Sequence, residues 1–146
     1  MAIFNLGSIN ADIFYRLPHL VEPGETLAAT SVYEGLGGKG ANMSVAAARA
    51  GAKVHHIGAV GSDGLWAIDR LAQYGVETQH IVTVQAKTGH AIIMIDDAGE
   101  NAIVLHPGAN HALLETGIAN ALSNGSAGDT LLLQNETNCQ RYTASW

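Results

Sequence analysis

The chain has 146 residues with 7 Lys and Arg against 13 Asp and Glu, and its formal net charge of −6 without a basic cluster argues against nucleic acid as a partner. Its 47% hydrophobic and 14% charged residues predict a single domain with a packed core and exclude disorder for most of the chain. A single cysteine excludes an intramolecular disulfide framework, and the lack of a signal-like start or of an apolar run of about 18 residues predicts a cytoplasmic protein without a membrane partner.

The first part of the chain predicts strands of two kinds. Residues 2–6 form a short apolar run closed by Gly7, which is typical of a buried strand that enters a turn. Between residues 11 and 36, alternating apolar residues and proline breaks predict small strands, with short pieces at 27–30 and 31–33. These small strands are expected to lie outside the main sheet.

The next part alternates helices and strands. Residues 41–50 are rich in Ala and stop at Gly51, which predicts a helix and its C-terminal end. Residues 53–60 are typical of a second buried strand, 64–74 of an amphipathic helix, and 81–84 of a short extended piece. This order favours a parallel sheet with crossover helices.

Two β-rich runs at 90–95 and 102–106 follow, and the turn-forming residues 96–101 between them predict an antiparallel hairpin. Residues 113–122 predict a helix, and 130–133 predict a further buried strand. The fold class expected from these elements is α/β.

The C-terminal tail begins a new element near Asn138, which we interpret as a helix that stops at Trp146. A parallel strand normally needs a crossover of about a dozen or more residues before its neighbour. The chain is therefore expected to end inside a structural unit, and one hypothesis for residues 142–146 is foreign sequence from a frameshift or a premature stop.

A glycine pattern raises a dinucleotide-binding hypothesis, because Gly35, Gly37 and Gly40 match G-x-G-x-x-G. That fingerprint belongs in the tight turn after the first strand, whereas the first strand here is expected to end at Gly7. Asp63 has the required spacing but opens a helix rather than ending a strand. A dinucleotide-binding domain is kept only as a remote alternative.

Residues 37–42, Gly-Gly-Lys-Gly-Ala-Asn, form a glycine-rich entry into a helix. Backbone N–H groups and the positive end of the helix dipole can meet an anion or a hydroxyl-rich ligand at such a place. Lys39 adds a donor, and Asn42 projects an amide from the first turn. From these residues alone, a binding site and an ordinary solvated helix start are equally weighted.

Polar residues also follow two predicted strands of the main sheet. Asn10 and Asp12 lie just past the first strand, and their spacing of two places them on the same side of an extended backbone. Their donors and acceptors suit vicinal sugar hydroxyls, although an Asx turn is the alternative. Glu136 lies three residues beyond the strand at 130–133, at the corresponding edge, where a solvated carboxylate is the alternative.

Metal and hydrolase chemistry find little support. His55 and His56 are adjacent in a predicted strand and so should face opposite sides, and no His-x-x-x-His spacing occurs. No G-x-S-x-G motif occurs either, and Asp96 and Asp97 are typical turn formers. We expect neither a metal site nor a catalytic triad.

Several windows in chain order together resemble the amino-terminal half of the ribokinase-like (PfkB-type) carbohydrate kinase family, over about residues 3–136. The motifs that carry the resemblance are Gly7-Ser8-Ile9-Asn10-Ala11-Asp12, Pro23-Gly24-Glu25-Thr26, Gly37-Gly38-Lys39-Gly40-Ala41-Asn42, the run Val45 to Gly51, Gly58-x-x-Gly61-x-Asp63, the strand from Thr88-Gly89 to Ile95, Gly99-Glu100-Asn101, and His106-x-Gly108-Ala109-Asn110.

The resemblance implies an α/β sandwich on a mostly parallel sheet, with a small β-sheet lid that covers the sugar and often mediates dimerisation. Residues 1–146 would then be the amino-terminal part of a single domain, with lid segments at about 11–36 and 90–106 and a homo-oligomer formed through the lid. The positions that match the family's sugar-binding residues are Asn10, Asp12, Gly38, Lys39, Asn42 and Glu136.

The implied reaction transfers the γ-phosphoryl group of Mg-ATP to a sugar hydroxymethyl group. The family's catalytic base lies in a Gly-Ala-Gly-Asp motif, which Ala127-Gly128-Asp129 echoes only superficially. We therefore expect no catalytic residue here, and no bound ATP, Mg²⁺ or monovalent cation, all of which the complete family enzyme would use.

The chain would thus supply a sugar-binding half that is inactive alone. The Gly38-Lys39-Gly40-Ala41-Asn42 sequence favours ribose or a related furanose, with fructose or a nucleoside left open. A non-enzymatic interaction or sugar-binding module that pairs through the lid or a sheet edge is the alternative.

Overall fold

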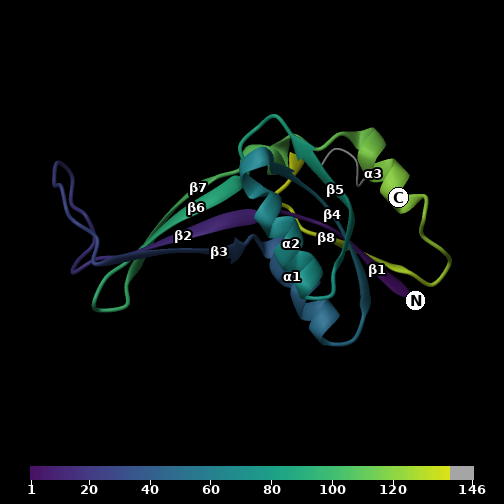
Figure 1. The fold of residues 1–146 in the computed structure, drawn as a ribbon, viewed down its shortest axis with the longest axis horizontal. Coiled ribbons are helices and arrows are strands. Elements are labelled where there is room, and N and C mark those ends of the chain that lie inside the picture. Colours follow the sequence, from purple (N-terminus) through teal and green to yellow (C-terminus); the bar gives the residue numbers. More distant parts are fainter. Residues whose placement is uncertain (139–146) are drawn as a thin grey trace.

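A computed structural model describes residues 1–138 of the chain, and it contains two four-stranded sheets that follow one another along the long axis of the molecule (Figure 1). The first sheet has the strand order β5-β4-β1-β8, and its three pairings are all parallel. Its strands are β1 (Ala2–Leu6), β4 (Lys53–Gly61), β5 (Glu77–Val84) and β8 (Thr130–Leu133).

Helices cover both faces of the first sheet, which confirms the α/β class. One core cluster packs α1 and α2 against residues such as Val54 and Val60, and the other packs α3 against residues such as Phe4 and Ile57. Among the described residues, no helix is both long and apolar enough to cross a bilayer. The helices are α1 (Lys39–Arg49), α2 (Leu65–Gln73) and α3 (Glu115–Leu122), with short 3₁₀ turns η1 (Ser62–Gly64) and η2 (Gly108–His111).

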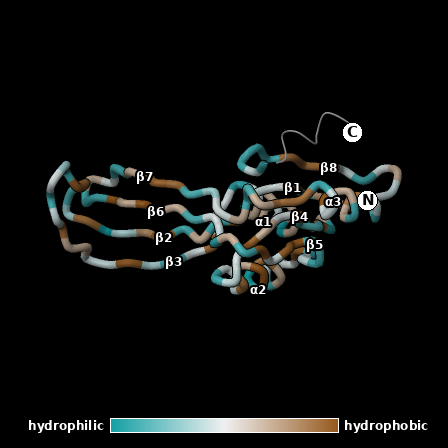
Figure 2. The backbone as a smooth tube through the Cα atoms, turned by 90° about the horizontal axis from the view of Figure 1, so that it is seen from above, coloured by the Kyte–Doolittle hydropathy of each residue, from teal (hydrophilic) through white to brown (hydrophobic). Residues whose placement is uncertain are grey.

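The second sheet has the order β3-β2-β6-β7 and projects away from the helices (Figures 1 and 2). The central pair β2·β6 is parallel, and the outer pairs β2·β3 and β6·β7 are antiparallel. Its strands are β2 (Asn10–Arg16), β3 (Ser31–Gly37), β6 (Gly89–Ile95) and β7 (Asn101–His106). The small strands outside the main sheet thus form a sheet of their own.

The largest differences from the sequence prediction concern β3, β5 and the segment before β3. Residues 27–29 form no strand, whereas β3 continues to Gly37 because it pairs with β2 as far as Asn10. Strand β5 begins at Glu77 rather than at residue 81, since its ladder with β4 starts there. The helix expected from about Asn138 and the hypothesis on residues 142–146 fall almost wholly outside the described residues.

The two adjacent histidines of β4 face opposite sides of the sheet, as the strand pattern predicts. The His55 ring stacks on Phe4 with ring centroids 4.8 Å apart, on the side of α3. His56 hydrogen-bonds to Ser44 of α1 on the other side. Within residues 1–138, no group of three or more His, Cys, Asp or Glu side chains could hold a metal ion.

Candidate functional site

Three chain segments meet where the two sheets join. Strand β1 passes through Gly7, Ser8 and Ile9 directly into β2, so one short connection links the sheets. Strand β8 pairs with β1 and ends at the same edge, which places Glu136 beside this connection. The carboxyl edge of a parallel sheet is where open α/β folds bind ligands.

The start of α1 presses directly against the end of β1. A Cβ atom on Gly40 would lie 2.4 Å from the backbone carbon of Gly7 and 2.4 Å from the nitrogen of Ser8. Such distances do not occur between real side chains and backbone, so only glycine allows this approach. The close contact fixes Ser8 next to Lys39, the first residue of α1.

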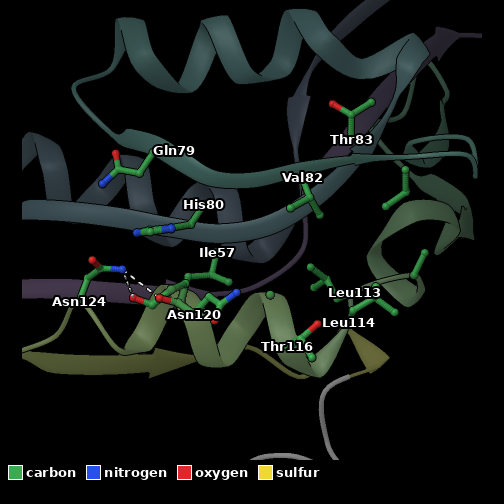
Figure 3. Close-up of a pocket in the computed structure, with 14 residues that line it drawn as sticks. Ile57, Gln79, His80, Val82, Thr83, Leu113, Leu114, Thr116, Asn120 and Asn124 are labelled. Carbon is green, nitrogen blue, oxygen red and sulfur yellow. Dashed lines mark hydrogen bonds between the residues drawn. The ribbon is translucent and has the colours of Figure 1, made fainter.

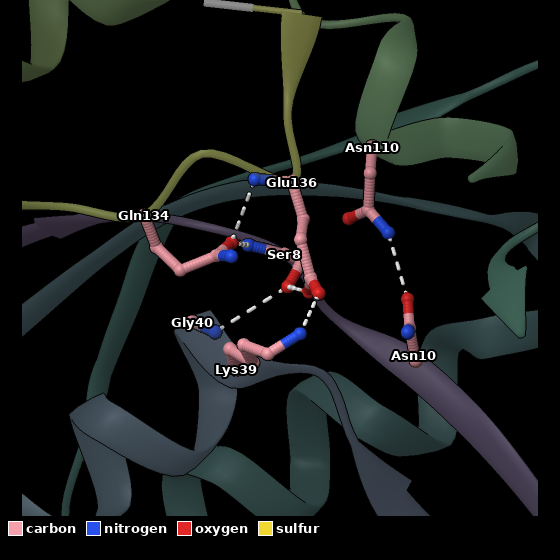
Figure 4. A network of polar contacts seen from close by, with 7 residues as sticks. All are labelled: Ser8, Asn10, Lys39, Gly40, Asn110, Gln134 and Glu136. Atoms are coloured by element: carbon pink, nitrogen blue, oxygen red, sulfur yellow. Dashed lines mark hydrogen bonds and ion pairs between the residues drawn. The ribbon is translucent and has the colours of Figure 1, made fainter. Parts of the chain in front are cut away.

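Glu136 is held at this junction by two hydrogen bonds (Figure 4). Its Oε2 atom accepts from Ser8 Oγ at 2.9 Å, and its Oε1 atom pairs with the Lys39 ammonium. The Gln134 Oε1 atom accepts from the backbone N–H of Glu136 at 3.2 Å and of Ser8 at 3.3 Å. Burial acts to raise the pKa of Glu136, but the bonds from Lys39 and Ser8 outweigh it and lower the pKa.

The helix start does not offer all its backbone donors to a ligand, which corrects part of the sequence interpretation. The Gly40 N–H donates to Ser8 Oγ at 3.3 Å, and the Ala41 N–H donates to the Ser8 carbonyl at 2.9 Å. Ser8 therefore occupies the place where an anion would meet these two groups. The groups through which α1 can contact a ligand in the cavity are therefore the side chains of Lys39 and Asn42.

Asn110 fixes the orientation of the Asn10 amide. The backbone N–H of Ile9 can only donate, so the Asn110 atom 2.9 Å away is its oxygen Oδ1. The Asn110 Nδ2 group then donates to the Ile9 carbonyl at 3.2 Å and to Asn10 Oδ1 at 2.8 Å. The Nδ2 group of Asn10 is consequently the end of this amide that can donate to a bound molecule.

A cavity of about 210 Å³ lies at the junction, and all six predicted sugar-binding residues line it. Its polar side contains Asn10, Asp12, Gly38, Lys39, Asn42 and Glu136, and its apolar side, from the second sheet, contains Ala91, Ile93, Ile103 and Leu105. Burial, and then the charge of Glu136, raise the pKa of Asp12. Donors and acceptors opposite an apolar wall suit a small polyhydroxylated molecule.

A larger cavity of about 610 Å³ lies between β5 and α3 (Figure 3). The polar side chains in its lining include Gln79, His80 and Asn120, and the lining contains no Asp, Glu, Lys or Arg residue. None of the residues predicted to bind sugar faces this cavity. Of these two cavities, the smaller one is therefore the one in which charged groups could orient a polar ligand.

The glycines of the dinucleotide hypothesis do not form the turn that it requires. Gly35 and Gly37 lie in the antiparallel strand β3, and two strands of the second sheet separate β1 from α1. Asp63 accepts from the backbone N–H of Thr88 at 3.0 Å and from its hydroxyl at 2.8 Å, so this carboxylate closes a loop. The geometry lacks the first strand-to-helix turn of a dinucleotide fold.

Comparison with known proteins gives this architecture a family. A model described as pfkB family carbohydrate kinase matches residues 3–139. The chain belongs to the PfkB family of carbohydrate kinases. A ribokinase from Haemophilus influenzae is 45% identical over 135 residues, which cover 90% of this chain and 44% of that protein.

Solved structures agree with this assignment. The ribokinase of Cryptococcus neoformans in complex with ADP superposes with a TM-score of 0.82 at 42% identity, over 98% of this chain and 45% of that one. The ribokinase of Arabidopsis thaliana complexed with ribose and ATP gives a TM-score of 0.80 at 29% identity, over 94% and 46%. The chain thus spans under half the length of these PfkB relatives.

Three residues of the polar network were not predicted as site residues from the sequence. Ser8 lies inside the Gly7 to Asp12 window, in which the sequence pattern indicated Asn10 and Asp12. Gln134 and Asn110 act through backbone groups 126 and 101 residues away in sequence. The motif His106-x-Gly108-Ala109-Asn110 was the one signal that pointed to Asn110.

Proposed function

We propose that the cavity at the sheet junction binds ribose or a related furanose, as the sugar-binding part of an ATP-dependent carbohydrate kinase. The observation that carries the proposal is the meeting of residues from β2, α1 and the segment after β8 around one small cavity. Membership of the PfkB family supports a sugar as the ligand. The ribose and ATP bound to the Arabidopsis relative support the choice of sugar.

Each polar residue has a role in this proposal. The Asp12 carboxylate accepts hydrogen bonds from sugar hydroxyls, and the Asn10 Nδ2 group donates to a hydroxyl oxygen. Asn42 adds a second amide from the first turn of α1. Lys39 and Glu136, which are paired with one another, present both a donor and an acceptor at the rim.

At the small cavity, the groups that could contact an anion such as a nucleotide phosphate are already engaged within the chain. Lys39 is the one cation in the cavity lining and is paired with Glu136, and two amides at the start of α1 already donate to Ser8. Asp129, the echo of the family's base motif, accepts from the N–H groups of Ala2 and Ser126, next to the amino end of β1 and far from the cavity. We therefore propose that the chain binds sugar without phosphorylating it.

A phosphotransfer assay tests this proposal. The purified chain is incubated with Mg-ATP and a panel of pentoses and hexoses, and sugar binding is measured in parallel by calorimetry. We expect ribose binding without sugar phosphate. Turnover would overturn the claim of inactivity, whereas absence of binding to every sugar would overturn the assignment of the cavity.

We also propose that the protein is located in the cytoplasm. Its single cysteine fits that reducing compartment.

The second sheet favours a second candidate role, in which two copies of the chain associate through it. Val32, Tyr33, Ile103, Val104 and Leu105 are each at least half exposed in this sheet. The first two lie in edge strand β3 and the other three in the opposite edge strand β7, and exposed apolar side chains on edge strands mark interaction surfaces. Light scattering after size exclusion tests this role, and a monomer at all concentrations would exclude it.

A further inference from the structure

Three buried polar side chains are linked by hydrogen bonds next to the candidate site. Asn5 of β1, Ser44 of α1 and His56 of β4 are each 0% exposed and lie between the first sheet and α1. None of them lines the sugar cavity. Their hydrogen bonds nevertheless end on Gly7 and Gly40, the two glycines whose backbones touch at the site.

These hydrogen bonds connect the backbone of Gly7 to the backbone of Gly40. His56 Nε2 lies 3.2 Å from the Gly7 carbonyl, and His56 Nδ1 lies 2.8 Å from Ser44 Oγ. Asn5 Nδ2 donates to Ser44 Oγ at 2.8 Å and to the Gly40 carbonyl at 2.7 Å. The end of β1 and the first turn of α1 are thus tied together through a residue of β4.

The proton positions follow from the acceptors. A carbonyl oxygen can only accept, so His56 carries its proton on Nε2 and donates to Gly7. The unprotonated Nδ1 then accepts from the Ser44 hydroxyl, whose oxygen accepts in turn from Asn5. The neutral ring is required for this arrangement, and burial lowers the pKa of His56 to about 4.

Stability alone is a weak explanation for these polar groups. Each of the three is fully removed from water, and Asn5 Oδ1 has no hydrogen-bond partner within the described part of the chain. Buried polar networks repay little of their desolvation cost in net free energy, but they select one geometry. The geometry selected here is the contact between Gly7 and Gly40.

We propose that Asn5, Ser44 and His56 are positioning residues, which hold the Gly7–Gly40 contact and thereby set Ser8, Lys39 and Glu136 for ligand binding. The effect on affinity rests on the proposed sugar-binding function. The effect on the junction itself does not, because the bonds from the Gly40 and Ala41 N–H groups to Ser8 lie entirely within the chain.

Four variants test the proposal. Ser44→Ala removes the central hydroxyl, and His56→Phe removes both ring nitrogens while it keeps the ring. His56→Gln restores a donor near the Nε2 position. His55→Phe is the matched control, because His55 lies next to His56 on the opposite face of β4 and does not touch the junction.

The first readout is amide hydrogen exchange without ligand. We expect faster exchange at Gly40 and Ala41 in Ser44→Ala and His56→Phe, while slow amides elsewhere in β1 and β4 stay unchanged, and a smaller effect in His56→Gln. The control should match the wild type. Equal exchange at Gly40 and Ala41 in all five proteins would overturn the proposal, and if His56→Phe does not fold, Ser44→Ala decides alone.

The second readout is the affinity for ribose by calorimetry, at a temperature where each variant is folded. We expect Ser44→Ala and His56→Phe to bind about fivefold more weakly, equivalent to one hydrogen bond, and the control to bind as the wild type does. Changed exchange with unchanged affinity would overturn the role in binding. A wild type that binds no ribose would instead refute the proposed function, and the exchange result would stand separately.

Discussion

Asp12 and Glu136 line the same small cavity, yet their surroundings shift their pKa values in opposite directions. Burial, and then the nearby Glu136, raise the pKa of Asp12, and no cation within residues 1–138 lowers it. Glu136 is also partly buried, but Lys39 and Ser8 donate to it and lower its pKa. Glu136 is therefore hydrogen-bonded within the protein, whereas Asp12 is the carboxylate that we propose a sugar hydroxyl contacts.

This difference predicts the effect of removing Asp12 on binding. Asp12→Ala should weaken ribose binding by about tenfold or more, the usual worth of hydrogen bonds to a charged group. Asp97→Ala is the control, since Asp97 lies in the exposed turn between β6 and β7. Calorimetric titration measures both, and equal affinities of the two variants would contradict the placement of Asp12 in the site.

Asp12 should also cost the free protein some stability. A carboxyl whose pKa is raised on folding destabilises the folded state once the pH is high enough to ionise it. Asp12→Asn removes that charge, so we expect a higher free energy of unfolding at pH 7 than in the wild type, together with weaker sugar binding. Urea denaturation checks this, and a less stable Asn variant would show that Asp12 has an unrecognised partner.

Glu136 should show the opposite pH dependence. Its lowered pKa stabilises the fold above the ordinary value of 4.5, and this contribution is lost as the pH falls through the folded value. Glu136→Gln should therefore lower the free energy of unfolding by about 1 kcal/mol at pH 7 and progressively less in acid. Urea denaturation across this pH range measures the difference, with the exposed Glu77→Gln as control, and a constant difference would refute the assignment.

At the level of elements, the sequence pattern locates strands and helices well where one local signal decides. The apolar run at residues 2–6 and the Ala-rich helix that precedes Gly51 are found close to their predicted places. The pattern fails where pairing with a distant strand decides. Residues 27–29 stay irregular and β5 extends back to Glu77, because backbone ladders with β2 and β4 set these limits.

The two glycines Gly35 and Gly40 of the same motif provide a test at this level. Gly40→Ala should lower the free energy of unfolding by about 2 kcal/mol or more, because its Cβ would meet the backbone of Gly7 and Ser8 at 2.4 Å. Gly35→Ala should be close to neutral, since nothing lies within 4 Å of a Cβ there. Urea denaturation compares the two, and equal losses would contradict the close contact.

For the whole molecule, the sequence predicts which polar residues line the site but not how their side chains are oriented. The six residues on the polar side of the cavity were predicted, because strand ends and a helix start imply a shared sheet edge and the ordered motifs imply a shared ligand. The orientation of Asn10 by Asn110 could not be read from the sequence, since it rests on contacts between residues 100 apart. Pairing between distant side chains leaves no local pattern.

Association through the second sheet is a prediction about the whole molecule. If copies pair there, Val104→Glu should shift the chain to monomer, because Val104 is 61% exposed in β7 and a carboxylate in a dry interface is costly. Leu114→Glu is the control, since Leu114 is 72% exposed but precedes α3, away from this sheet. Sedimentation velocity measures the mass, and equal behaviour of the two variants would exclude this surface.

The central claim is that the small cavity at the sheet junction binds sugar, and the most direct test is a titration of the ¹⁵N-labelled chain with ribose followed by NMR. The claim predicts saturable shifts of the backbone amides of Asn10, Asp12, Gly38, Lys39 and Asn42, while the amides around the larger cavity, such as those of His80 and Leu113, stay in place. Shifts that gather at the larger cavity, or no saturable shift at all, would contradict it.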